Sequence, residues 1–192
     1  MNSIKQRDEG FTGLEAAIVL IAFVVVAAVF SYVVLGAGFF TTQKSQETVY
    51  KGVEQSTSNL QMIGNVYGTA TTPTSGIDNM QFNIGLAPGA PALDLTKMII
   101  IISRPGSSTV TQLTMVGAGT TADGTHFAVV NASDSTRYET LSGQGQATIK
   151  LNLATVLAKN GQINIQLSPA VGASLPFTRT APATLDSSQI LY

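Results

Sequence analysis

Residues 16–40 read Ala16-Ala-Ile-Val-Leu20-Ile-Ala-Phe-Val-Val25-Val-Ala-Ala-Val-Phe30-Ser-Tyr-Val-Val-Leu35-Gly-Ala-Gly-Phe-Phe40. This stretch has no charged residue and is longer than the roughly 20 residues that a helix needs to cross a bilayer. A single acid, Glu15, stands immediately before it, after a short charged segment at residues 1–10. A carboxylate at the edge of hydrocarbon is costly. The stretch therefore predicts a long apolar helix that begins with an acid in need of a partner.

The helical pattern continues beyond the apolar run. Glu47 and Lys51 are four residues apart and Lys44 precedes Glu47 by three, spacings that bring side chains together on a helix. We predict one helix from Thr12 to Asn65, on the order of 80 Å long and more than twice the ~30 Å core of a bilayer. A plain membrane anchor gains nothing from such length. The apolar residues of the second half fit one narrow seam: Val49, Val53, Leu60, Ile63 and Tyr67.

Two general alternatives exist for the apolar run. It could anchor a membrane protein, with Lys5 and Arg7 on the cytoplasmic side. It could also be a secretory signal that is cut at the small residues 36–38. Such signals have a core of roughly 7–15 apolar residues, so the length of this run disfavours the second alternative.

The second half of the chain has the pattern of β-structure. Residues 68–76 have the composition of a linker or turn, and Asp123-Gly124 and Asn160-Gly161 are turn signals. Short strands with little helix between them predict an antiparallel β-sandwich or barrel, and so an α+β fold for the whole chain. The predicted strands are Met98–Ile102, which reads as a continuous buried run, Thr109–Val116, His126–Asn131, Thr148–Leu153 and Ile163–Leu167.

Composition limits the classes of function. Only 11% of the residues are charged and the net charge is −1, so the chain lacks the basic footprint of a nucleic-acid-binding protein. It has no cysteine, which excludes disulfides and thiolate metal sites. A surface with so little charge suits a subunit that buries much of itself against neighbours.

The sequence offers little for an active site. His126 is the only histidine, so a histidine-based metal cluster is excluded, and we expect an ordinary strand-end residue there. Residues 117–122 approach a dinucleotide-binding fingerprint, but no βαβ unit surrounds them, so we expect a loop. Asp123 and Asp134 lack the fixed spacing of a calcium site. We predict no catalytic residue, no metal and no cofactor. Asn131-Ala-Ser133 is a sequon, which makes Asn131 a candidate for glycosylation.

Residues 10–23, Gly10-Phe-Thr-Gly-Leu-Glu15-Ala-Ala-Ile-Val-Leu-Ile-Ala-Phe23, resemble the start of an archaeal flagellin, or archaellin. The leader segment of this family, and its removal before the apolar helix, are similar to those of type IV pilins. The resemblance is specific over about residues 10–67 and weaker beyond. It implies an immunoglobulin-like head, a membrane-held precursor and an assembly platform in the membrane. It also implies a leader peptidase that cuts after Gly10, so that Phe11 becomes the N-terminus with Glu15 close to it.

On this resemblance we expect three segments: a cleaved leader at residues 1–10, a filament-core helix at 11–67 and a β-sandwich head at 68–192. The chain would then be a structural subunit of the archaellum, the archaeal motility filament, and would work by polymerisation. Its partner would be copies of itself, joined through a helical interface that never closes, in a filament outside the cell. The assembly residues that we select are Glu15, Leu20, Phe23, Val26, Phe30 and Leu35.

Two other functions remain open at this point. A pilin-like adhesion subunit would share the helix and present a binding surface on its head. A membrane-anchored β-domain that binds a ligand or partner would keep its N-terminus intact and stay in the membrane.

Overall fold

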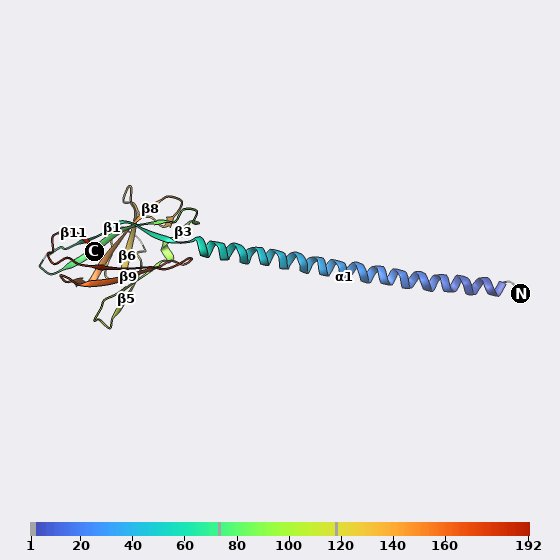
Figure 1. The fold of residues 1–192 in the computed structure, drawn as a ribbon. Coiled ribbons are helices and arrows are strands. Elements are labelled where there is room, and N and C mark those ends of the chain that lie inside the picture. Colours follow the sequence, from blue (N-terminus) through green and yellow to red (C-terminus); the bar gives the residue numbers. More distant parts are fainter. Residues whose placement is uncertain (1–2, 73, 118) are drawn as a thin grey trace. The chain divides into compact units, whose positions relative to one another are not determined.

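The computed structural model describes residues 3–72, 74–117 and 119–192, with side chains from residue 13 onward. The chain divides into two compact units, Met1–Lys51 and Gly52–Tyr192. The first unit is helical, and the second holds the end of the helix and the β-structured head (Figure 1). The predicted α+β fold, a long helix followed by a mostly antiparallel β domain, is confirmed.

Helix α1 runs without interruption over Ser3–Thr57 (Figure 1). It begins well before Thr12, so the segment before Gly10 continues the same helix. No proline interrupts these 55 residues. Near the end of the apolar run, Thr41 and Thr42 donate their hydroxyls to the carbonyls of Ala37 and Gly38, at 2.8 and 2.9 Å. These polar side chains are therefore satisfied within the helix.

The predicted end of the helix, at Asn65 or Tyr67, is wrong. The helix stops at Thr57, and Leu60 begins strand β1 (Leu60–Thr69). Within β1 the pairing register shifts between Ile63 and Tyr67, where Gly64 has a φ of 77°. This bulge breaks the regular alternation of a strand. Leu60 is buried, Ile63 is half-buried and Tyr67 is exposed, so the three residues do not share one face. The seam residues beyond Val53 therefore belong to a strand.

In the residues that the structure describes, the head contains eleven strands, and nine of them form one sheet in the order β10-β9-β4-β5-β6-β8-β2-β1-β11. Neighbours are antiparallel except β5 and β6, which pair in parallel through two registered positions. The short strands β3 and β7 pair separately, and a 3₁₀ turn, η1 (Leu95–Lys97), follows β3. The remaining bounds are β2 Ile77–Leu86, β3 Leu93–Asp94, β4 Ile99–Ser103, β5 Val110–Met115, β6 His126–Asn131, β7 Thr140–Leu141, β8 Gln146–Leu157, β9 Gln162–Ser168, β10 Leu175–Thr180 and β11 Ser188–Leu191.

One hydrophobic core holds the sheet together. The rings of Phe82 on β2 and Phe177 on β10 form a T-shaped pair with their centroids 5.2 Å apart, which joins the two halves of the sheet across the core. The backbone groups of Thr180 and Tyr192 exchange two hydrogen bonds, so the last residues of β10 and the residue after β11 lie side by side. The core is drawn from alternate positions of the strands, for example Ile100 and Ile102, Ala147, Ile149 and Leu151, and Ile163, Ile165 and Leu167.

All five strands predicted from the sequence are confirmed, each within a few residues of its bounds. The run at Met98–Ile102 differs in burial, because Ile99 and Ile101 are half-buried on the outer face while Ile100 and Ile102 fill the core. The predicted linker at residues 68–76 is shorter, since Gly68 and Thr69 still belong to β1. Asn160 has a φ of 54°, which agrees with the predicted turn there.

Gly172 allows the chain to enter the head after the helix. Ser58, the first residue beyond α1, is 3% exposed, and its carbonyl oxygen would lie 1.8 Å from a Cβ atom placed on Gly172. The φ of Gly172 is 101°, a conformation that other residues adopt with strain. A side chain at position 172 would therefore push the first segment of the head away.

Gly172→Ala should destabilise the head by about 3 kcal/mol or more, through backbone strain and steric overlap. The measurement is thermal unfolding of the full chain in detergent, followed by circular dichroism in the β region. Gly89→Ala is the matched control, because Gly89 has a φ of 83° but nothing within 4 Å of its added Cβ. Equal losses in the two variants would mean that the contact with Ser58 contributes nothing.

Candidate polymerisation surface

Helix α1 presents apolar side chains on every side. Within its described part, large apolar residues from Leu14 to Phe40 are each more than half exposed. A helix that is apolar all the way round is stable only when an apolar environment or other helices surround it. The segment Gly13–Thr57 is long and apolar enough to cross a membrane by length and composition. The surface of α1 therefore requires lipid or other helices around it.

The five apolar residues selected from the sequence all lie on this surface. Their exposed fractions are 65% for Leu20, 70% for Phe23, 62% for Val26, 71% for Phe30 and 59% for Leu35. Exposed apolar patches of this extent mark interaction surfaces in proteins. The arrangement can therefore support association through α1, and the neighbouring valines and isoleucines are equally available.

Glu15 is exposed on the first described turns of the helix. Its carboxylate makes no hydrogen bond or ion pair with any residue in the described part of the chain. Gly10 and Phe11 lie in the helical backbone, but the side chain of Phe11 is outside the described residues. The chain itself thus offers Glu15 no partner from residue 13 onward.

The polar half of the helix has a small ion-pair network. Glu47 accepts one bond from Lys44 and one from Lys51, each at 2.7 Å, as the spacing predicts. The three side chains are exposed, so solvent screens both pairs and each adds little to the stability of the helix. This network marks the part of α1 that tolerates water.

In the head, His126 serves a local structural role. Asp123 accepts hydrogen bonds from the backbone N–H groups of Thr125 and His126 at 2.7 and 2.6 Å, and its carboxylate lies 3.1 Å from His126 Nδ1. Hydrogen bonds hold the pKa of Asp123 well below its usual range. The largest contribution comes from the backbone N–H of Thr125, and the hydroxyl of Thr125 and the groups of His126 add to it. These bonds form a turn that leads into β6, at the predicted Asp123-Gly124 position.

The described residues contain no group of three metal-ligating side chains. Asp134 accepts bonds from the backbone and hydroxyl of Thr136, at 3.0 and 2.7 Å, which is another local turn. Residues 117 and 119–122 connect β5 to β6 without a helix, and Ala118 lies outside the described residues.

Asn131 ends β6 and is half-buried. Its Oδ1 accepts the backbone N–H of Ser133 at 2.9 Å, so the sequon is folded into a tight turn. The other side-chain atom, Nδ2, has no hydrogen-bond partner in the part of the chain that the structure describes. The nitrogen that would carry a glycan is therefore unengaged.

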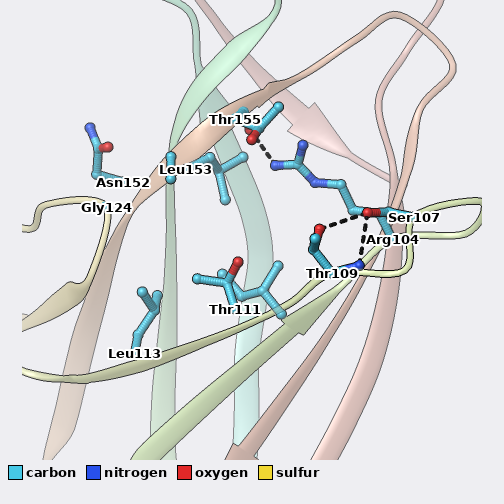
Figure 2. A pocket seen from close by; sticks show the side chains of 11 residues that line it. Arg104, Ser107, Thr109, Thr111, Leu113, Gly124, Asn152, Leu153 and Thr155 are labelled. Carbon is cyan, nitrogen blue, oxygen red and sulfur yellow. Dashed lines mark hydrogen bonds between the residues drawn. The ribbon is translucent and has the colours of Figure 1, made fainter.

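A pocket of about 230 Å³ lies between the start of β5 and the last third of β8 (Figure 2). The side chain of Arg104, just after β4, reaches across it and donates to the carbonyls of Thr155 and Val156. Strand β6 pairs with β8 only as far as Lys150, so β6 does not reach these carbonyls. Burial lowers the pKa of Arg104, which remains a cation. The polar residues around it are Ser107, Thr109, Thr111 and Asn152.

A family model described as archaeal-type flagellin matches residues 10–179. The chain belongs to this family of archaeal-type flagellins. Probable flagellin 1 of Archaeoglobus fulgidus is 37% identical over 195 residues, which cover 97% of this flagellin and 96% of that protein.

Two solved structures are similar as well. A chain of the archaeal flagellum of Methanospirillum hungatei strain JF1 is 34% identical, with a TM-score of 0.73, and the match covers 94% of this chain and 99% of that one. Archaeal flagellin FlaB1 of Methanocaldococcus jannaschii shares the fold, with a TM-score of 0.61 and 19% identity. The match covers 70% of this chain and 96% of that one.

These similarities define what the flagellin does. It is a structural subunit of the archaellum and not an enzyme. It assembles with copies of itself into a filament outside the cell. The predicted family and function are confirmed, and the alternatives of an adhesion subunit and a ligand-binding β-domain are set aside.

Proposed function

We propose that the flagellin is made as a membrane-held precursor, cut after Gly10 by a leader peptidase, and transferred by a membrane assembly platform into the filament. The new N-terminus is Phe11. In the filament, the apolar half of α1 packs among identical helices, and Leu20, Phe23, Val26, Phe30 and Leu35 are buried there. The head lies outside this core. The observation that carries the proposal is the apolar surface of α1, which the described part of the chain leaves uncovered.

The change of environment supplies the driving force. In a bilayer, lipid already surrounds the apolar side chains of α1, so helices gain little from association through the hydrophobic effect. Outside the membrane, each Å² of apolar surface that leaves water contributes about 25 cal/mol. Polymerisation is therefore favoured at the point where the helix leaves the lipid, and the polymer does not return to monomers in water.

Glu15 needs a partner once this core forms. A buried carboxylate costs several kcal/mol unless it is paired or hydrogen-bonded. Cleavage after Gly10 creates a positive α-amino group on Phe11, four residues before Glu15 on the helix. We assign this group, on the same or an adjacent subunit, as the partner of the carboxylate; the hydroxyl of Thr12 is a local alternative. The N-terminus and Glu15 then act together only after processing.

Glu15→Ala should give subunits that are processed normally but enter filaments poorly. The measurement compares processed subunit in the membrane with subunit in sheared filaments, by quantitative immunoblotting. Glu15→Gln is the matched control, because it keeps the shape and hydrogen bonding of the side chain but removes its charge. If Glu15→Ala entered filaments as well as the wild type, the proposed pairing would be wrong. The acid would then only stabilise the helix through its dipole, by a few tenths of a kcal/mol up to about 1 kcal/mol.

Asn131 is the proposed glycosylation site. Its free Nδ2 and the turn at Ser133 support this assignment, since an attached glycan would displace no hydrogen bond. A glycan there would add a polar cover to a head that has few charges.

Mass spectrometry of filaments sheared from cells tests both assignments. The N-terminal peptide should begin at Phe11, and the peptide that contains Asn131 should be heavier than its sequence by the mass of a glycan. Filament subunits that begin at Met1 would contradict the processing site. An unmodified Asn131 peptide would contradict the glycan and leave the polymerisation proposal intact.

A further inference from the structure

Arg104 is a partly buried cation without a counter-ion. Its two terminal nitrogens donate to backbone carbonyls of Thr155 and Val156, which are neutral. No carboxylate in the described part of the chain forms an ion pair with it. The guanidinium group has more N–H donors than these two bonds use. It can therefore bind an anion at the pocket without giving up its contacts to β8.

The pocket suits a single carboxylate. It holds one positive charge and is lined by the neutral hydroxyl or amide groups of Ser107, Thr111 and Asn152. One carboxylate balances one guanidinium, whereas a doubly charged phosphate would remain uncompensated. The volume of about 230 Å³ is ample for the end of an acidic side chain.

The head also carries a carboxylate without a partner. Asp186 lies on the exposed connection between β10 and β11, and its side chain makes no hydrogen bond or ion pair in the described part of the chain. Glu54, on the helix, is three residues from Lys51 and so has a cation at helical spacing. The other acids of the head are bonded within it: Asp78 to Thr71, Asp94 to Lys97, Asp123 to His126, Asp134 to Thr136 and Glu139 to Arg137.

We propose that the Arg104 pocket of one subunit binds the carboxylate of Asp186 from a neighbouring subunit in the filament. The subunit polymerises with copies of itself, so every copy brings both halves of the contact. Both groups lack a partner of opposite charge in the described part of their own chain, and the contact supplies one to each. The helices provide the affinity, and this pair fixes how adjacent heads are placed.

Cross-linking tests the contact while leaving both charged groups in place. The chain has no cysteine, so Ser107→Cys, at the pocket, and Ser187→Cys, beside Asp186, introduce the only thiols. Filaments of the double variant, treated with a short bismaleimide, should give a ladder of covalent oligomers on a denaturing gel. Filaments that mix the two single variants should give dimers.

Two controls make the result specific. Ser107→Cys with Ser142→Cys carries the same number of thiols, with the second on the β7–β8 connection, and should give no ladder. Asp186→Asn added to the reactive pair should lower cross-linking at least five-fold, and it breaks no bond within its own head. A ladder equal to that of the Ser142→Cys control, or one that Asp186→Asn does not change, would overturn the proposal. Neither result would bear on leader cleavage or on the helix core, because both are read in assembled filaments.

Charge reversal gives an independent measurement. Arg104→Glu and Asp186→Arg should each lower the midpoint temperature of filament dissociation, and the double variant should recover most of the loss. Lys159→Glu, an exposed cation outside the pocket, is the control for the change of net charge. A double variant that is no better than the worse single variant would contradict the pairing.

Discussion

No filaments should form from subunits that carry Val26→Asp. The residue lies in the middle of the apolar run and 62% of its side chain is exposed on α1, where the proposed core would cover it. A carboxylate at the centre of an apolar helix costs roughly 2.5–3.5 kcal/mol in membrane insertion, and in a filament each subunit would bear a similar cost. Electron microscopy of sheared cell surfaces should show a complete loss, while protease resistance of the head in detergent stays unchanged.

Val26→Leu is the matched control, since it keeps the site apolar and should assemble normally. Wild-type filaments give a second test of the same core. Because no ion pair is essential for affinity, they should persist in high salt, and detergents that solvate the helices should dissolve them. Filaments that fell apart in salt and survived detergent would place the affinity between heads, and the helix-core proposal would be wrong.

Gly10→Val should leave the full-length precursor in the membrane and cells without filaments. The proposed scissile bond follows Gly10, and a β-branched side chain there would crowd the peptidase and stiffen the local backbone. Without cleavage, the leader stays attached and Phe11 has no free amino group to pair with Glu15. Immunoblots should show only the slower-migrating precursor, and electron microscopy should show bare cells.

Gly10→Ala adds one methyl group and should be cut more slowly, which separates bulk at the scissile bond from loss of backbone freedom. Normal filaments from Gly10→Val cells would refute the processing site. Uncut precursor that still assembled would instead refute the role given to the new N-terminus.

The sequence was sufficient to predict α1 and the character of the head. Residues 16–40 are uniformly apolar, and strands such as Ile163–Leu167 alternate cleanly, so local pattern and burial agree. The end of the helix was missed because two signals coincided. Leu60, Ile63 and Tyr67 have helical spacing in the sequence, and the irregular pairing at Gly64 breaks the alternation that would have indicated a strand. That irregularity depends on pairing with β2.

Other features depend on contacts that a sequence does not show. β2 contains Asn79 and Asn83 among its apolar residues, and each side-chain oxygen accepts a hydrogen bond from β8: from Asn152 at 3.0 Å and from Thr148 at 2.7 Å. The Arg104 pocket was also missed. Nothing near Arg104 in the sequence indicates that residues 51 and 52 positions further on supply its partners. An ion pair between near neighbours, such as Lys44 with Glu47, can be predicted from the sequence. A contact between residues far apart in the chain, such as that of Arg104 with Thr155, cannot.

The pairing of β1 with β11 has a consequence for biosynthesis. Residues Val66–Thr69 find their second neighbour only in Ser188–Leu191, so the sheet cannot close while the ribosome still holds residues near 190. The hydrophobic segment of α1 emerges far earlier and is available for targeting during translation. Membrane engagement therefore precedes completion of the head, and a prematurely terminated product would reach the membrane with one side of β1 open to other chains. Cellular quality control would meet such products at the membrane surface, before any of them joined a growing polymer.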